Sequence, residues 1–236
     1  MPAAQRVVII TGASQGIGAG LVAAYRERGW AVIANARSIK PDEDPAVLAV
    51  AGDIRETETA DRIVGEALRR LGQIDTLVND AGVYLGKPFT DYTRDEYEAV
   101  VGINLTGFFI LTQRVVAAML ARSSGHIVNV AATIAERPNS KVPAVLAALT
   151  KGGVAAATRS LAIEYADRGI RVNAVSPGII QTPLLAPDSY ASSAGLVPLG
   201  RIGQVSDIVD GVLFLESSPY ITGEILHIDG GQIAGH

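Results

Sequence analysis

Residues 6–18 constrain the fold more than any other stretch of this chain. The β-branched run Val7 to Ile10 is typical of a strand buried on both faces of a parallel sheet. It ends at a turn with Gly12, Gly16 and Gly18, and a helical pattern follows. Such glycines let the backbone approach a phosphate closely, and the helix N-terminus offers free N–H groups to the anion. We therefore expect a dinucleotide phosphate site, although the G-x-x-x-G-x-G spacing departs from the commoner G-x-G-x-x-G. The alternative is that these glycines only relieve crowding.

The remainder of the chain alternates between short apolar runs and amphipathic segments. The pattern predicts strands at 7–10, 31–34, 47–50, 74–78, 127–131, 170–175 and 224–228, and helices at 15–28, 57–71, 93–121, 142–166 and 205–215. This alternation predicts an α/β fold, a three-layer doubly wound parallel sheet of about seven strands. We expect one domain over 1–236, with a substrate loop rich in Pro, Ser and Gly at about 183–200.

Composition excludes several classes of function. The chain is 48% hydrophobic and 19% charged with a net charge of −4, and no run of Lys and Arg favours nucleic acid. With no cysteine, the chain has no disulfides, thiolate metal ligands or Cys nucleophile. The three histidines are scattered, so we expect no metal site. No signal peptide and no apolar run of membrane-spanning length is evident, which predicts a cytoplasmic protein away from the membrane.

The ends of the second and third strands bear on the choice of cofactor. Arg37, after small neutral neighbours, suits the 2′-phosphate of NADP better than the ribose hydroxyl of NAD, although a solvated loop arginine is the alternative. Asp53 is placed to accept a bond from the adenine amino group or to cap the next helix. The small-residue turn Asn79 to Gly82 lies where parallel sheets bind ligands.

Separate motifs, in order along nearly the whole chain, resemble those of the short-chain dehydrogenases/reductases. They are TGASQGIG at 11–18, GDI at 52–54, NDAG at 79–82, NLTG at 104–107, GHIVNV at 125–130, TKGG at 150–153, RVNAVSPG at 171–178, PLGRIG at 198–203 and ITGEILHIDGG at 221–231.

The resemblance implies a cofactor site and an activity. It places the phosphates at Gly12, Ser14, Gln15, Gly16, Ile17 and Gly18, the adenine at Asp53 and Ile54, the ribose at Asn79, Ala81, Gly82 and Lys151, and the nicotinamide at Pro177, Gly178, Ile180 and Thr182. The implied reaction is hydride transfer between the nicotinamide and a small carbonyl compound or alcohol. The family uses a Tyr as acid, a Ser on the carbonyl oxygen, a Lys one helical turn after the Tyr, and an Asn that holds a relay water. It also implies a homo-oligomer, a dimer or tetramer.

Two of these four catalytic residues are missing. Lys151 and Asn104 occupy their positions, but Ala147 stands where the tyrosine is expected and Ala132 where the serine is expected. The Ser-to-Tyr spacing points to a small insertion at 136–141, and no tyrosine lies between residues 97 and 165, so no shift of register restores the acid. The candidate substitutes are Lys151 itself, a water held by Asn104 and Lys151, Thr133, or a loop tyrosine (Tyr84, Tyr92 or Tyr190).

Two functions therefore remain open at the level of sequence. One is an NADP-dependent oxidoreductase with a rebuilt proton-delivery site. The presence of both Lys151 and Asn104 favours this function. The other is a non-catalytic NADP-binding protein, a sensor or a structural subunit assembled through the helices at 93–121 and 142–166. The second of these helices is rich in Ala, which favours close helix contacts.

Overall fold

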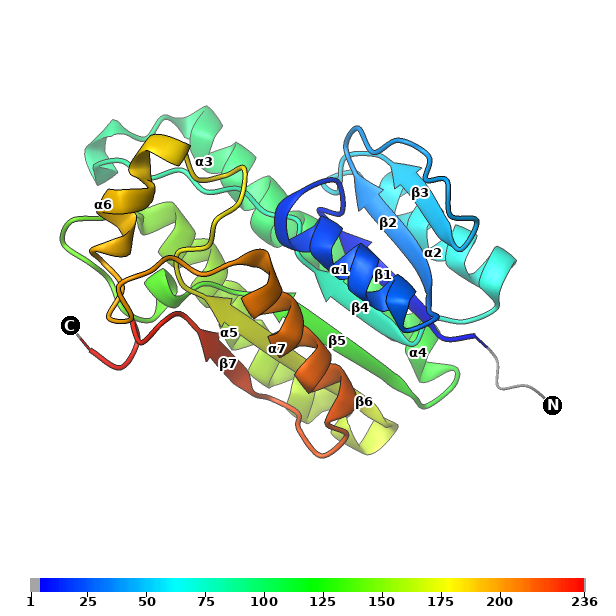
Figure 1. The fold of residues 1–236 in the computed structure, drawn as a ribbon. Coiled ribbons are helices and arrows are strands. Elements are labelled where there is room, and N and C mark those ends of the chain that lie inside the picture. Colours follow the sequence, from blue (N-terminus) through cyan, green and yellow to red (C-terminus); the bar gives the residue numbers. More distant parts are fainter. Residues whose placement is uncertain (1–4, 236) are drawn as a thin grey trace.

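The computed structural model describes residues 5–235, which are organised around a seven-stranded, all-parallel sheet (Figure 1). The strand order is β3-β2-β1-β4-β5-β6-β7, so the direction of winding reverses between β1 and β4. The strands are β1 (Val7–Thr11), β2 (Ala31–Ala36), β3 (Val47–Ala51), β4 (Thr76–Asn79), β5 (Gly125–Val130), β6 (Ile170–Pro177) and β7 (Ile225–Ile228). In an open sheet of this kind, ligands bind outside the carboxyl ends of the strands at the reversal.

Two layers of helices cover the sheet and complete the predicted three-layer fold. In Figure 1, α1 (Gly16–Glu27) and α7 (Val205–Ser217) lie in front of the sheet, and their apolar side chains share one core with residues of β1, β2 and β6. On the other face, α2 (Thr57–Leu71), α4 (Phe108–Leu120) and α5 (Val145–Tyr165) enclose a second core. The β-branched run of β1 contributes alternate side chains to both cores, which explains why it is apolar throughout.

A long helical stretch crosses behind the sheet in three parts. It starts at α3 (Arg94–Val101) with a capping box between Thr93 and Glu96, which the Thr-x-x-Glu pattern of the sequence predicts. It continues through a π-helix, η2 (Gly102–Gly107), and ends with α4. By length and composition, Arg94–Leu120 is apolar enough to cross a membrane, which corrects the expectation that no segment is. Leu111, Val115 and Met119 are fully buried in the core behind the sheet, which accounts for much of this apolar character.

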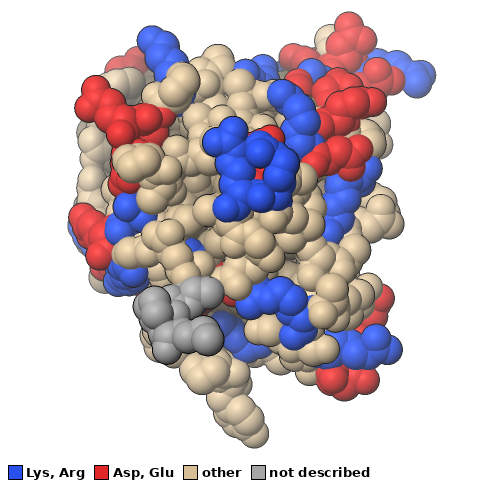
Figure 2. Space-filling model, turned by 90° about the vertical axis from the view of Figure 1, so that its right-hand side faces the viewer, with Lys and Arg blue, Asp and Glu red and all other residues tan. Residues whose placement is uncertain are grey.

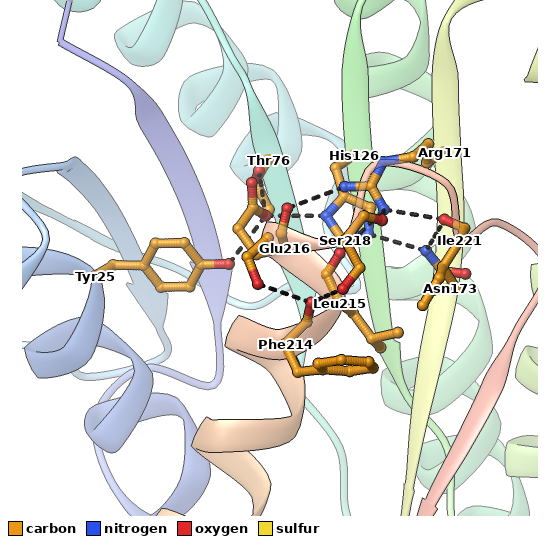
Figure 3. Close-up of polar contacts among 11 residues, drawn as sticks. Tyr25, Thr76, His126, Arg171, Asn173, Phe214, Leu215, Glu216, Ser218 and Ile221 are labelled. Atoms are coloured by element: carbon orange, nitrogen blue, oxygen red, sulfur yellow. Dashed lines mark hydrogen bonds and ion pairs between the residues drawn. The ribbon is translucent and has the colours of Figure 1, made fainter.

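A polar network joins α7 to the amino ends of the strands (Figure 3). One carboxylate oxygen of Glu216 accepts hydrogen bonds from the Thr76 hydroxyl (2.9 Å), the Tyr25 hydroxyl (3.3 Å) and the His126 ring (2.9 Å). The side-chain oxygen of Asn173 accepts a hydrogen bond from the Glu224 backbone amide. The side-chain NH₂ group of Asn173 therefore faces His126 and donates to its Nε2. His126 is therefore neutral with its proton on Nδ1, directed at Glu216.

Arg171 completes the attachment of α7. Its guanidinium donates to the carbonyl oxygens of Leu215, Ser218 and Ile221 at 3.0–3.2 Å and to that of Glu216 at 3.3 Å. A cation at the end of a helix satisfies carbonyl groups that have no partner within the helix and complements the helix dipole.

Several predicted boundaries need correction. The helix predicted from residue 142 begins at Val145, because Ala144 is not helical. The strand predicted at 170–175 continues to Pro177, the last residue of β6. The loop predicted at 183–200 contains a short helical stretch, η5 (Pro187–Ser189) followed by α6 (Tyr190–Ala194). Short 3-10 turns also occur as η1 (Phe89–Asp91), η3 (Thr133–Ala135) and η4 (Ala166–Arg168).

The charge on the face that includes β3 and α2 is mixed. Figure 2, which views the molecule from the right-hand side of Figure 1, shows acidic and basic side chains interspersed over this face. Ion pairs along α2 contribute to this pattern, with Glu66 2.6 Å from both Arg69 and Arg70. This face therefore offers no continuous positive field of the kind that binds nucleic acid.

Candidate active site

A cleft of about 900 Å³ opens at the carboxyl ends of the strands, where the winding reverses. The turns that follow β1, β2, β3, β4, β5 and β6 all contribute to it, together with the start of α5 and the segment 182–196. Almost every residue predicted for the cofactor lines this cleft. Those that do are Gly12, Ser14, Gln15, Gly16, Ile17, Arg37, Asp53, Ile54, Ala81, Gly82, Lys151, Pro177, Gly178, Ile180 and Thr182.

The glycine turn after β1 is built as the sequence predicts. Gly12 and Gly16 have positive φ angles of 70° and 55°, which other residues rarely adopt. A Cβ on Gly18 would lie 2.4 Å from the Gly12 carbonyl oxygen, so only glycine lets α1 begin this close to the turn. The N-cap residue Gln15 makes no side-chain cap bond. The Gln15 side chain therefore leaves the N–H groups of Gly16 and Ile17 for a ligand anion, whereas the Gly18 amide acts on the Asp80 carboxylate.

The ends of β2 and β3 form the side of the cleft where the resemblance places the adenine. Asn35 is buried and donates to the carbonyl oxygens of Val50 (2.9 Å) and Gly52 (3.3 Å), which ties the two strand ends together. Arg37 is exposed and lines the cleft, and no acidic residue occurs in the stretch 35–38. A guanidinium without an adjacent carboxylate at this point fits a phosphate better than a ribose hydroxyl.

Asp53 differs from the expectation in one respect. Its carboxylate forms a fork with the Arg55 guanidinium at 2.7–3.1 Å and also accepts the Arg55 amide, and this pairing holds its pKa below the usual range. The N-cap of α2 is Glu56, so Asp53 is not the helix cap that the sequence allowed. The adenine contact of Asp53 stays a prediction.

These features fit a pyridine dinucleotide. The glycine turn is a cradle that a Cβ would fill, the helix N-terminus is uncapped, and the cleft extends from Arg37 to Lys151. When bound, a nicotinamide dinucleotide supplies or accepts a hydride. The residues that would hold it are those of the glycine turn, the ends of β2 and β3, the turn after β4 and the segment 177–182.

Lys151 and Asp80 form the charged centre of the cleft. The Lys151 ammonium donates to the Val130 carbonyl oxygen at 2.7 Å, and it lies 3.1 Å from where a Cβ on Gly82 would be. Burial lowers the pKa of Lys151, and the nearby Asp80 carboxylate opposes that change. Burial likewise raises the pKa of Asp80 to about 7, against the opposing effects of Lys151 and the Gly18 amide. Burial therefore disfavours the charged form of both groups.

Asp80 is a site residue that the sequence reasoning missed. One of its carboxylate oxygens lies about 3 Å from the Cβ positions of Gly12 and Gly18, directly beside the glycine turn. Its backbone amide and that of Ala81 donate to the Thr11 hydroxyl at 3.1 and 3.0 Å, which joins the turns after β4 and β1. The feature of the sequence that could have indicated Asp80 is an acidic residue within the small-residue turn 79–82.

Asn104 lies in the π-helix η2, and single π turns inside α-helices are frequent at functional sites. Both hydrogens of its amide are used, one by the Val83 carbonyl oxygen and one by the Thr150 hydroxyl, each at 3.0 Å. Its side-chain oxygen accepts the Val83 amide at 2.9 Å. The side chain thus fixes the turn after β4 against α5. Asn79 is similarly buried, and its NH₂ group donates to Thr112 and Asn129 inside the fold.

Ala132 and Ala147 line the cleft together with Lys151, so the structure brings both substituted positions to its centre. The adjacent Thr133 is buried, and its hydroxyl lies 3.2 Å from the Ser176 carbonyl oxygen and 3.3 Å from the Asp229 carboxylate. Its single hydroxyl hydrogen is engaged by these acceptors. Its role as a substitute acid stays a prediction.

The three loop tyrosines named as substitutes do not occupy equivalent places. Tyr84 lines the cleft, and burial raises the pKa of its phenol. The Tyr92 hydroxyl donates to the Leu85 carbonyl oxygen at 2.7 Å, and Tyr190 lines a separate shallow depression beside α6. Among the three, Tyr84 alone contributes to the cleft wall.

The segment after β6 closes the side of the cleft where the resemblance places the nicotinamide. The Gly178 amide donates to the Ile228 carbonyl oxygen at 3.0 Å, and Gln232 accepts the Ile179 amide at 3.1 Å. A Cβ on Gly178 would lie 2.2 Å from the Gln232 side-chain oxygen, so glycine is needed where these segments meet. Gln232, which also lines the cleft, is a second residue that the sequence reasoning did not single out.

Comparisons with known proteins agree with this geometry. Residues 12–232 match a family model described as enoyl-(acyl carrier protein) reductase. The chain is 33% identical to 3beta-hydroxysteroid dehydrogenase 1 of Eggerthella lenta, over 96% of this chain and 93% of that one. It is similar in structure to ElxO with NADP bound (TM-score 0.91, 26% identity, 98% and 99% of the two chains). It is also similar to a 3-ketoacyl-(acyl-carrier-protein) reductase of Brucella melitensis complexed with NADH (TM-score 0.90, 31% identity, 97% and 98% of the two chains).

Proposed function

The chain belongs to the short-chain dehydrogenase/reductase family of NAD(P)-dependent oxidoreductases, and on that premise we propose that it transfers hydride between NADP(H) and a small carbonyl compound or alcohol. The observation that carries this proposal is the position of Lys151, held by Val130 beside Asp80 at the centre of the dinucleotide cleft. A lysine with a lowered pKa here can release a proton toward a carbonyl oxygen above the nicotinamide. Proton delivery is then atypical, because the tyrosine position holds Ala147.

The first test is turnover with a panel of carbonyl compounds and NADPH, followed by absorbance. We expect Lys151→Ala to reduce turnover at least ~10²-fold, the size of a general-acid contribution. The exposed Lys141→Ala, which does not line the cleft, is the matched control and is expected to behave as the parent. Turnover in the parent that survives in Lys151→Ala contradicts the proposed role of this lysine.

A second candidate function is favoured by one observation, the pair of alanines at the centre of the cleft. If the protein binds NADP without catalysis, as a sensor or as a subunit of a hetero-oligomer, the parent shows no turnover. The double variant Ala132→Ser, Ala147→Tyr then gains activity, by ~10²-fold or more over background. Turnover in the parent before any substitution contradicts this alternative.

Our preference for NADP over NAD rests on Arg37. A charge-assisted bond of this kind contributes about 1.5 to 3 kcal/mol, so we expect Arg37→Ala to weaken NADP binding about 10- to 100-fold. Affinity for NAD, which lacks the 2′-phosphate, stays unchanged. Calorimetric titration of both dinucleotides measures the difference, and equal losses for NADP and NAD contradict it.

We also propose that the protein forms a homodimer or homotetramer through the layer of α4 and α5. Phe109 on α4 is 60% exposed and Ile163 on α5 is 80% exposed, although both are large apolar side chains. Small residues along α5 allow another helix to approach closely. Light scattering measures the state, and Phe109→Lys with Ile163→Lys is expected to yield monomers. The cytoplasmic location stays a prediction.

A further inference from the structure

The charges along the cleft divide into three groups by place. Arg37 and Asp53 stand at the ends of β2 and β3, and Asp80 and Lys151 stand at its centre. The remaining charged residue of the lining is Arg137, which follows β5 and η3 on the side away from the adenosine end. No acidic side chain lines this part of the cleft within residues 5–235.

The backbone of the segment 136–142 holds Arg137 in place. The Arg137 amide donates to the Thr133 carbonyl oxygen at 2.9 Å, and a bridge between Asn139 and Val142 closes the turn that follows. The Arg137 side chain is exposed, and its guanidinium lies 3.5 Å from the Ile233 carbonyl oxygen, at the rim of the cleft. In the part of the chain that the structure describes, it forms no ion pair.

The neighbouring acid is directed elsewhere. One carboxylate oxygen of Glu136 lies 3.0 Å from Nε2 of His227 and accepts the Ser176 hydroxyl at 3.3 Å. Glu136 is outside the cleft lining, so it does not neutralise Arg137 there. The sequence pair Glu136-Arg137 is therefore split, with the acid bound to the strands β6 and β7 and the base left at the rim.

Two segments contribute apolar side chains to the cleft lining. Ile134, Val142 and Ala147 come from the stretch that contains Arg137, and Leu184, Leu185 and Leu196 come from the segment 182–196. A ligand that fills this space needs an apolar body, and a ligand that reaches Arg137 needs an anionic end. A single guanidinium matches a carboxylate in charge and in the planar arrangement of two oxygens.

We infer that Arg137 selects the substrate, and that the substrate is a carbonyl compound with an apolar chain and a carboxylate at its far end. This inference rests on the proposed function, because the substrate end is defined by where the nicotinamide would lie. Arg137 acts here on affinity, and the carbonyl group remains with the centre of the cleft.

The test uses straight-chain oxo acids of about eight carbons, with the ketone moved along the chain, each compared with its methyl ester. Affinity is measured by calorimetry on protein saturated with NADP⁺, which has no hydride to donate, so no ketone is reduced during the titration. We expect at least one acid to bind about 10- to 100-fold more tightly than its ester. We expect Arg137→Gln to abolish that preference, and Arg137→Lys to retain part of it.

Lys141→Gln is the matched control, since Lys141 is an exposed base in the same segment but lies outside the cleft lining. It is expected to keep the full preference. The melting temperature and NADPH affinity of Arg137→Gln establish that the fold and the cofactor site are retained. The inference is overturned if no acid binds more tightly than its ester, or if the preference survives in Arg137→Gln. Failure of NADPH to bind the parent is a different result, which refutes the proposed function and the inference with it.

Discussion

The two ends of the sheet bury ionisable groups in opposite ways. At the amino ends, Glu216 and His126 are enclosed by hydrogen-bond partners, and their protonation states follow from that network (Figure 3). At the carboxyl ends, Asp80 and Lys151 are half-buried and face a cleft of about 900 Å³. The first pair holds a helix on the sheet, and the second is left to interact with a ligand.

The pKa values reflect this difference. Burial alone would raise the pKa of Glu216, but the bonds from His126 and Thr76 and the charge of Arg171 hold it below its usual value. Around Asp80, the charge of Lys151 and the Gly18 amide do not outweigh the effect of burial, and its pKa rises to about 7. Among buried carboxylates, a lowered pKa thus accompanies a structural role here, and a raised pKa marks the candidate functional site.

The largest effect is expected from breaking the network at the amino ends. Glu216→Ala removes the acceptor of His126, Tyr25 and Thr76 and leaves three buried donors unpaired. Loss of one partner of a buried pair costs about 3 to 5 kcal/mol, which urea unfolding measures directly. Glu66→Ala on the exposed surface of α2 removes contacts of 2.6 Å and is expected to change the free energy of unfolding far less, because exposed ion pairs are screened by solvent. Equal losses in the two variants would contradict a structural role for the network.

At the carboxyl ends, removal of the Asp80 carboxylate is expected to stabilise the protein. The pKa of Asp80 is about 7 in the fold, against about 3.9 in the unfolded chain, so between these pH values the folded protein holds a proton that the unfolded chain has lost. Stability therefore falls as the pH rises from about 4 to about 7, and the full cost persists above 7. Asp80→Asn is expected to gain about 1 to 4 kcal/mol at pH 8 and nothing at pH 4, as measured by thermal unfolding.

His126 gives the opposite dependence. Burial lowers its pKa in the fold, so the unfolded chain takes up a proton first as the pH falls below about 6.5. The contribution of neutral His126 is full above that pH and is lost in acid. A gain for Asp80→Asn that is the same at pH 4 and pH 8 would show that the two ends do not differ in this way.

The smallest changes in stability are expected from substituting two glycines that have different surroundings. Gly18→Ala places a methyl group 2.4 Å from the Gly12 carbonyl oxygen, and we expect a loss of about 1 to 3 kcal/mol together with loss of NADP binding. Gly65→Ala in α2 meets nothing within 4 Å and is expected to gain about 0.5 to 1 kcal/mol, with NADP binding unchanged. Chemical unfolding and calorimetry measure both quantities. A stabilised Gly18→Ala that still binds NADP would refute the close contact at the glycine turn.

The sequence predicted the elements well and the contacts between them less completely. The β-branched run of β1, the bounds Thr57–Leu71 of α2 and the capping box of α3 depend on nearby residues, and all three are confirmed. The pairing of Asp53 with Arg55 depends on rotamers, which a motif does not specify. Asp80 lies beside the glycine turn although more than sixty positions separate the two in the sequence. The resemblance assigns a role to the neighbours of Asp80 in the motif and none to Asp80 itself.

The strand order also determines when this cleft can exist during synthesis. The first half of the chain builds the sheet outward from β1 to β3, and the second half builds it in the other direction from β4 to β7. Apart from β2 and β3, whose paired residues lie 15 positions apart, neighbouring strands pair across 24 to 68 positions, and such non-local pairing slows folding. The central strand β1 therefore leaves the ribosome with one edge unpaired until β4 follows, and a nascent chain that stops before β4 exposes that apolar edge.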